Sequence, residues 1–132
     1  MRDIRLALHL GHYTWLALHL AVEPAESPIL SEGRRGAHRI EGIGVGFVPP
    51  LWKPHVADEI TSVSSPDAYD MARRLAREEG IFAGASTGGN VAVALRVAEA
   101  LPPDATVATL AVDTGLKYLS TELYRARDER SP

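Results

Sequence analysis

The pattern of apolar and polar positions predicts alternating strands and helices. Residues 16–22 and 58–63 are short runs with strand-forming side chains, typical of buried strands. From residue 65 to residue 80 the apolar side chains recur at helical spacing, with Ser65 as the expected N-cap, Pro66 at the first helical position and Gly80 after the last turn. The pattern predicts an amphipathic helix there.

A second set of elements follows this helix. Residues 81–83 have the character of the end of a short buried strand, residues 91–100 of a mostly buried helix, and residues 106–112 of another apolar strand. Strands that alternate with helices are joined by crossovers, so the prediction is an α/β fold with a partial doubly wound parallel sheet. Ligands in such folds bind at the carboxyl ends of the strands.

The connection GASTGGN, residues 84–90, is the main candidate for chemistry, because a strand that turns into a helix aims free backbone N–H groups at whatever lies above it. It matches the G-x-S-x-G nucleophile elbow, whose triad needs a histidine after the serine. All histidines precede Ser86: they are His9, His12, His19, His38 and His55. The hydrolase is therefore excluded, and a ligand-binding turn and a purely structural turn stay open.

Two other glycine-containing patterns have weaker interpretations. Asp113-Thr114-Gly115 is the aspartic-protease triplet, but only residues 116–132 follow it and the elements before it are not all-β. The sequence GIGVGF, residues 42–47, lacks the spacing of a dinucleotide fingerprint. Its glycines instead indicate backbone that passes close to a bulky group.

Composition fits one ordinary globular domain, since 132 residues with 45% hydrophobic and 23% charged side chains suffice for a single core. A net charge of −3 argues against a nucleic-acid surface, and no apolar run is long enough to cross a membrane. The absence of cysteine fits the cytoplasm. His9 and His12 share helical spacing, but no further ligands stand nearby, so no metal site is expected.

Five segments, in this order and spacing, resemble the C-terminal part of cysteine synthase (O-acetylserine sulfhydrylase), in the pyridoxal-phosphate family that includes cystathionine β-synthase. They are VEPAESP at 22–28, HRIEGIGVGFVP at 38–49, AREEGI at 76–81, GASTGG at 84–89 and DTGLKYLST at 113–121. The resemblance implies the C-terminal part of the tryptophan-synthase-β-like fold over residues 22–124. Residues 1–21 are then an atypical N-terminal segment and residues 125–132 a tail.

The resemblance also implies a pyridoxal-phosphate site. Ser86 is expected to hydrogen-bond the pyridine nitrogen of the cofactor. The glycine-rich loop, residues 42–47, is expected to line the cofactor and substrate cavity. The expected cofactor-binding residues are Gly44, Val45, Gly46, Ser86, Thr87, Asp113 and Thr114. No catalytic residue is expected in this chain, because the Schiff-base lysine motif and the phosphate loop of relatives lie upstream of the matched part. Lys53 and Lys117 are the only lysines, and neither stands in that motif.

The implied function is that of a fragment or half of a β-replacement enzyme that makes cysteine and acetate from O-acetylserine and sulfide. Alone, the chain is expected to be inactive, and to bind an amino-acid substrate only when the missing half completes it. The alternative is a non-enzymatic remnant that acts as a partner-binding or assembly module. In either case the open sheet edge and apolar surface favour self-association, for instance as a homodimer.

Overall fold

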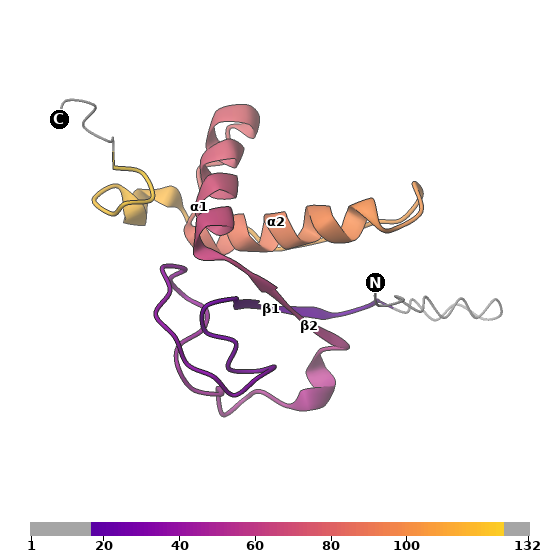
Figure 1. Cartoon of the computed structure of the whole chain (residues 1–132). Coiled ribbons are helices and arrows are strands. Elements are labelled where there is room, and N and C mark those ends of the chain that lie inside the picture. Colours follow the sequence, from indigo (N-terminus) through magenta and orange to yellow (C-terminus); the bar gives the residue numbers. More distant parts are fainter. Residues whose placement is uncertain (1–16, 126–132) are drawn as a thin grey trace.

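The fold is built on a small parallel sheet. The computed structural model describes residues 17–125, in which β1 (Leu20–Pro24) pairs in parallel with β2 (Glu59–Val63), and the register runs from Leu20 opposite Glu59 to Pro24 opposite Val63. The long connection between the strands contains one short 3-10 helix, Pro54–Val56. Figure 1 shows the two strands on one side of the molecule and both α-helices on the other. The predicted parallel α/β class is confirmed.

The first helix, α1 (Ser65–Arg74), continues into a π-helical turn, Leu75–Glu79, and ends at Gly80 with a φ of 69°. Its N-cap is Ser64, whose hydroxyl accepts a hydrogen bond from the Asp67 N–H at 3.2 Å. The prediction of Ser65 as N-cap is therefore wrong by one residue. The Ser65 hydroxyl instead accepts a hydrogen bond from the Arg39 N–H at 2.9 Å, which ties the segment just before the glycine-rich loop to α1.

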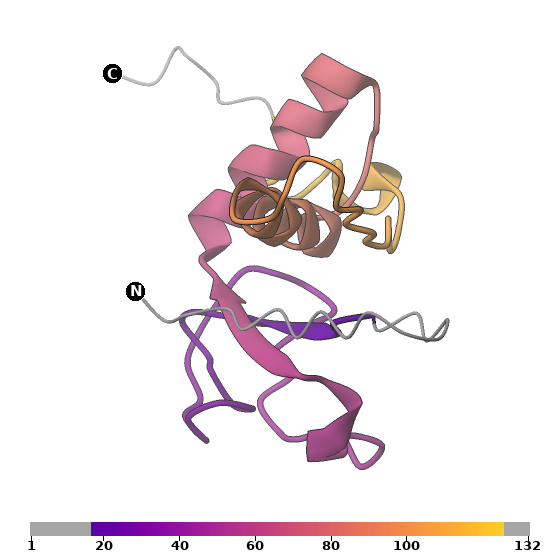
Figure 2. The same cartoon turned by 90° about the vertical axis from the view of Figure 1, so that its right-hand side faces the viewer.

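The second helix, α2 (Ala85–Glu99), packs against α1 and lies over the sheet (Figure 2). It begins six residues before the predicted start at residue 91, so most of the GASTGGN connection is helical. Glycine, serine, threonine and asparagine have low helix propensity, which is why the pattern predicts a turn there. Packing decides the outcome, since a Cβ on Gly88 would lie 2.1 Å from the carbonyl oxygen of Ala68 in α1. Only glycine allows the helices to approach this closely.

The strands predicted at 81–83 and 106–112 are not formed in the described part of the chain. What remains is one isolated antiparallel bridge between Ala83 and Thr114. Two backbone hydrogen bonds hold it. The Gly84 N–H donates to the carbonyl oxygen of Asp113 at 3.2 Å, and the Gly115 N–H donates to the carbonyl oxygen of Phe82 at 3.0 Å. A strand needs a neighbour to pair with, and residues 106–112 have none among residues 17–125.

One apolar cluster joins the elements. It draws on the loop after β1, on β2, on both helices and on the segment after α2. Its buried members are Ile40, Val63, Ala68, Tyr69, Ala72, Ala85, Val93, Tyr118 and Leu123. The last segment is fastened by Arg73, whose guanidinium donates to the carbonyl oxygens of Leu123 at 2.8 Å and Glu122 at 2.7 Å.

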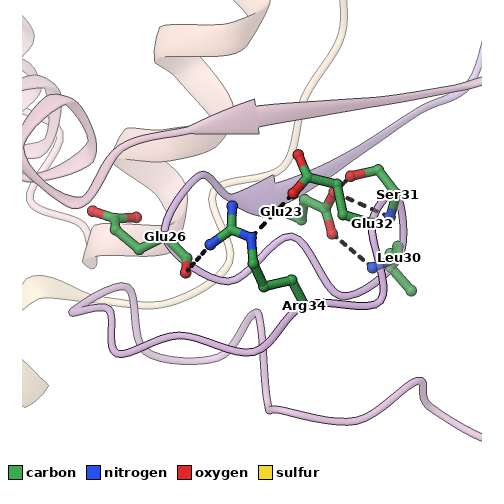
Figure 3. A network of polar contacts seen from close by, with 6 residues as sticks. All are labelled: Glu23, Glu26, Leu30, Ser31, Glu32 and Arg34. Atoms are coloured by element: carbon green, nitrogen blue, oxygen red, sulfur yellow. Dashed lines mark hydrogen bonds and ion pairs between the residues drawn. The ribbon is translucent and has the colours of Figure 1, made fainter.

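A buried carboxylate organises the loop after β1 (Figure 3). Glu23 is 2% exposed and accepts hydrogen bonds from the N–H groups of Leu30 at 2.8 Å and Ser31 at 3.3 Å, and from the Ser31 hydroxyl. Arg34 adds an ion pair to Glu32 at 3.1 Å. Residues 25–36 contain no helix or strand, and the Glu23 carboxylate fixes this loop to the carboxyl end of β1.

Candidate functional site

The N-terminus of α2 carries the central candidate residue. Gly84 is its N-cap and no side chain caps the helix, so the N–H groups of the first turn lack the usual capping acceptor. Ser86 lies in this turn and is 3% exposed. A hydroxyl and free N–H groups at the positive end of a helix form a polar environment within an otherwise apolar core.

Two of the predicted site residues accept hydrogen bonds from backbone N–H groups. The Thr87 hydroxyl accepts from the Val112 N–H at 3.0 Å, and the Thr114 hydroxyl accepts from the Leu116 N–H at 3.3 Å. Thr114 thereby caps the short 3-10 helix Gly115–Tyr118. Both threonines position the segments around Ser86, and their ligand contacts stay a prediction.

Asp113 lies directly against the start of α2. Its Oδ2 accepts from the Tyr118 hydroxyl at 2.8 Å and pairs with the Lys117 ammonium at 3.4 Å. Its Oδ1 is buried and has no hydrogen-bond partner among the described residues. A Cβ on Gly84 would lie 2.2 Å from Oδ1, so Gly84 must be glycine for the carboxylate to reach this place. The helix dipole favours a negative charge there.

Tyr118 is a neighbour that the site prediction missed. Burial, and then the Asp113 carboxylate that its hydroxyl bonds, raise the pKa of Tyr118 to about 12, and the Glu41 carboxylate adds to the effect. The only sequence signal was its place in the motif DTGLKYLST. A Cβ on Gly84 would lie 2.2 Å from Asp113 Oδ1 and 2.5 Å from the Tyr118 ring, so both side chains lie against the start of α2, which only the fold shows.

Stability is expected to fall at high pH because of Tyr118. Its pKa is 10.0 as a model phenol and about 12 in the folded chain, so the folded state favours the protonated form. The stabilisation is complete below pH 10.0 and is lost as the pH rises through about 12. Thermal unfolding followed across this range checks it. Tyr118→Phe should show a shallower dependence, and an unchanged dependence would contradict the assignment to Tyr118.

The glycine-rich loop forms the second part of the site. Gly44 and Gly46 have φ values of 60° and 80°, in the region that favours glycine. A Cβ on Gly44 would also lie 2.5 Å from Pro24, and the Gly44 carbonyl oxygen is 2.8 Å from Nε2 of His38. Residues 38–46, which include exposed Val45, line an open cavity of about 380 Å³. The expectation of backbone pressed against a bulky group holds for Gly44, and the group is Pro24.

The two parts are connected through the core. Ile40 of the loop, Ala85 of α2 and Tyr118 belong to the same buried cluster. The Glu41 carboxylate also lies close enough to raise the pKa of Tyr118. Ser86 and Asp113, however, do not line the cavity formed by residues 38–46. The structure thus brings the loop and the α2 N-terminus together as neighbours.

The comparison with protein families identifies the group to which this arrangement belongs. Residues 7–113 match the family model described as pyridoxal-phosphate dependent enzyme. The chain belongs to this family. Among curated relatives, the "Probable cysteine synthase" of Bacillus subtilis (strain 168) is 48% identical over 103 residues, covering 78% of this chain and 33% of the relative. The cysteine synthase of Staphylococcus aureus (strain Mu50) is 41% identical, covering 83% and 35%.

Solved structures agree with this assignment. O-ureido-L-serine synthase superposes with a TM-score of 0.79 at 41% identity, over 85% of this chain and 35% of that one. Cysteine synthase from Entamoeba histolytica gives 0.76 at 38% identity, over 85% and 33%. The predicted resemblance and fold are confirmed. The chain spans about a third of the length of the relatives that it matches.

No group of three metal-ligating side chains occurs among residues 17–125, and His9 and His12 lie outside these residues. In the same part of the chain, no helix is long and apolar enough to cross a membrane.

The residues present fit one edge of pyridoxal phosphate. Ser86 offers a hydroxyl in the first turn of α2, no side chain caps that turn, and the Asp113 Oδ1, which lies against the N-cap Gly84, has no hydrogen-bond partner among the described residues. A ring nitrogen would engage the Ser86 hydroxyl, whereas the Asp113 carboxylate, held by Tyr118 and Lys117, positions this edge. The described lysines are Lys53, in an exposed loop, and Lys117, which is paired with Asp113.

Proposed function

We propose that this chain supplies the part of a cysteine-synthase-type enzyme that holds the ring-nitrogen edge of pyridoxal phosphate. The observation that supports this most is the buried Ser86 in the uncapped first turn of α2, whose N-cap Gly84 lies directly against the Asp113 carboxylate. The family match and the relatives named cysteine synthase give the site its chemical class.

In this proposal pyridoxal phosphate, when bound, supplies the electron sink for replacing the acetate of O-acetylserine by sulfide. Ser86 holds the pyridine nitrogen through a neutral hydroxyl, which does not favour a protonated ring as a carboxylate would. Gly44 and Gly46 keep side chains away from the cavity wall, and Val45 projects from that wall toward the substrate. Thr87, Asp113 and Thr114 position this edge.

The Schiff-base lysine and the phosphate-binding loop come, in this proposal, from the remaining two thirds of the fold. This division follows from the coverage, since the matched relatives are about three times as long as the matched region. Lys117 is an unsuitable substitute because its ammonium is engaged by the Asp113 carboxylate. An amino-acid substrate would bind between the two parts.

A chimaera tests this function. The matched stretch of this chain replaces its counterpart in the Bacillus subtilis relative, and cysteine formation from O-acetylserine and sulfide is measured. We expect activity above that of the relative lacking the stretch. The 132-residue chain alone, mixed with pyridoxal phosphate and reduced with borohydride, should give no stoichiometric adduct at Lys53 or Lys117. A folded, cofactor-loaded chimaera without cysteine formation would refute the proposal, as would turnover by the lone chain through one labelled lysine.

A further inference from the structure

Residues 106–112 form an exposed apolar segment without strand partners. No backbone–backbone hydrogen bond of the described residues involves residues 106–112, although the sequence has the composition of a buried strand. Leu110 is 75% exposed, and Val107 and Val112 are also exposed. The stretch from Ala105 to Val112 contains no charge and no proline, which are the usual means of protecting an open strand edge.

Helix α2 holds this segment in a defined direction. The Asn90 side chain donates to the Leu110 carbonyl at 3.5 Å, and the Thr87 hydroxyl accepts from the Val112 N–H at 3.0 Å. Later residues of the segment thus meet earlier residues of α2, and the segment runs back beside the helix (Figure 1).

β2 also runs roughly opposite to α2, as Figure 1 shows. The segment therefore has the same direction as β2 and, because β1 and β2 are parallel, as β1. This is the direction of a further strand in a crossover-built parallel sheet.

Only one edge of the segment is engaged by α2. In an extended strand, the polar backbone groups of alternate residues point to the same edge. The Leu110 carbonyl and the Val112 N–H both meet α2, so the N–H groups of Val107, Thr109 and Ala111 point to the opposite edge. That second edge is free among residues 17–125.

We propose that this free edge of residues 106–112 binds a parallel β-strand from the remaining two thirds of a cysteine-synthase-type chain. The proposal rests on the proposed function, and it names the surface through which the two parts combine. O-ureido-L-serine synthase superposes on 85% of this chain while only 35% of its own length is matched, so most of its fold has no counterpart here. A second copy fits less well, because a two-fold axis would pair identical strands antiparallel.

The test uses separate polypeptides. The full 132-residue chain is produced together with the part of the Staphylococcus aureus cysteine synthase that lies outside the match, and the complex is measured by sedimentation. We expect a one-to-one complex. Thr109→Pro removes a donor on the free edge and should weaken it by about tenfold or more. Ala108→Pro, whose N–H points to the other edge, should weaken it less.

A side-chain substitution tests the same surface independently of the two proline variants. Leu110→Lys places a charge on the exposed apolar face and should also weaken the complex, whereas Leu51→Lys, at an exposed position outside the segment, should not. Circular dichroism of each free variant shows that folding is retained.

Equal binding by Thr109→Pro and Ala108→Pro would overturn the proposal. So would self-association that blocks binding of the relative's part. An active chimaera whose separate parts do not associate would overturn the docking edge and leave the proposed function intact.

Discussion

Replacing Gly88 with alanine is expected to lower the free energy of unfolding by about 1–3 kcal/mol. The added Cβ would lie 2.1 Å from the Ala68 carbonyl oxygen and 2.7 Å from the Ala72 amide nitrogen, both backbone atoms of α1. Backbone cannot move aside as a side chain can, so the two helices must separate along their contact. Since α2 carries Ser86, the same change should also displace the candidate site.

The matched control is Gly89→Ala in the same helix. Both changes gain about 1 kcal/mol of helix propensity, so they differ only in what the new methyl group meets. At Gly89 the nearest atom is a side-chain carbon of Val63 at 3.1 Å, which can adjust by a small movement. Denaturant unfolding of both variants measures the difference. Equal stability of the two would show that the close approach of α1 and α2 at Gly88 is not a constraint.

The elements that the sequence predicts correctly are those with local signals. Periodicity identified α1 because its apolar stripe and its end at Gly80 are local signals. The start of α2 was placed too late, because GASTGGN has low helix propensity and becomes helical only through its contact with α1. The predicted strand at 106–112 is not formed because a strand needs a neighbouring strand to pair with. The sequence of the segment alone cannot show whether such a neighbour is present.

The candidate site divides in the same way. Ser86 and the glycine-rich loop were accessible to sequence reasoning because they lie in contiguous motifs. The contact of Asp113 with Gly84 was not, because it joins two chain segments across an isolated bridge. The motif predicts that Thr87 binds the cofactor, which stays a prediction, and the fold adds that its hydroxyl accepts a hydrogen bond from the Val112 backbone N–H. Motifs identified the residues, and only the fold shows which atoms are already engaged.

Ser86→Asp is expected to reduce cysteine formation by the chimaera by about a hundredfold. A carboxylate beside the pyridine nitrogen raises the pKa of that nitrogen by a few units and holds it protonated, which changes the electron demand of the cofactor. Ser86→Ala removes a single neutral hydrogen bond, so it should cost about 0.5–1.5 kcal/mol, or at most about tenfold in rate. The two substitutions should therefore differ in the size of the rate loss and also in whether the pyridine nitrogen becomes protonated.

Because Ser86 is only 3% exposed, a larger side chain could act through packing alone. Ser86→Asn is the matched control, since it has nearly the volume of aspartate without its charge. If Ser86 contacts the ring, only Ser86→Asp shifts the pH dependence of the cofactor's absorbance spectrum, and Ser86→Asn behaves more like Ser86→Ala in this measurement. If Asp and Asn variants lose activity equally and leave the spectrum of the bound cofactor unchanged, Ser86 acts by packing α2, and the hydroxyl does not hold the pyridine nitrogen.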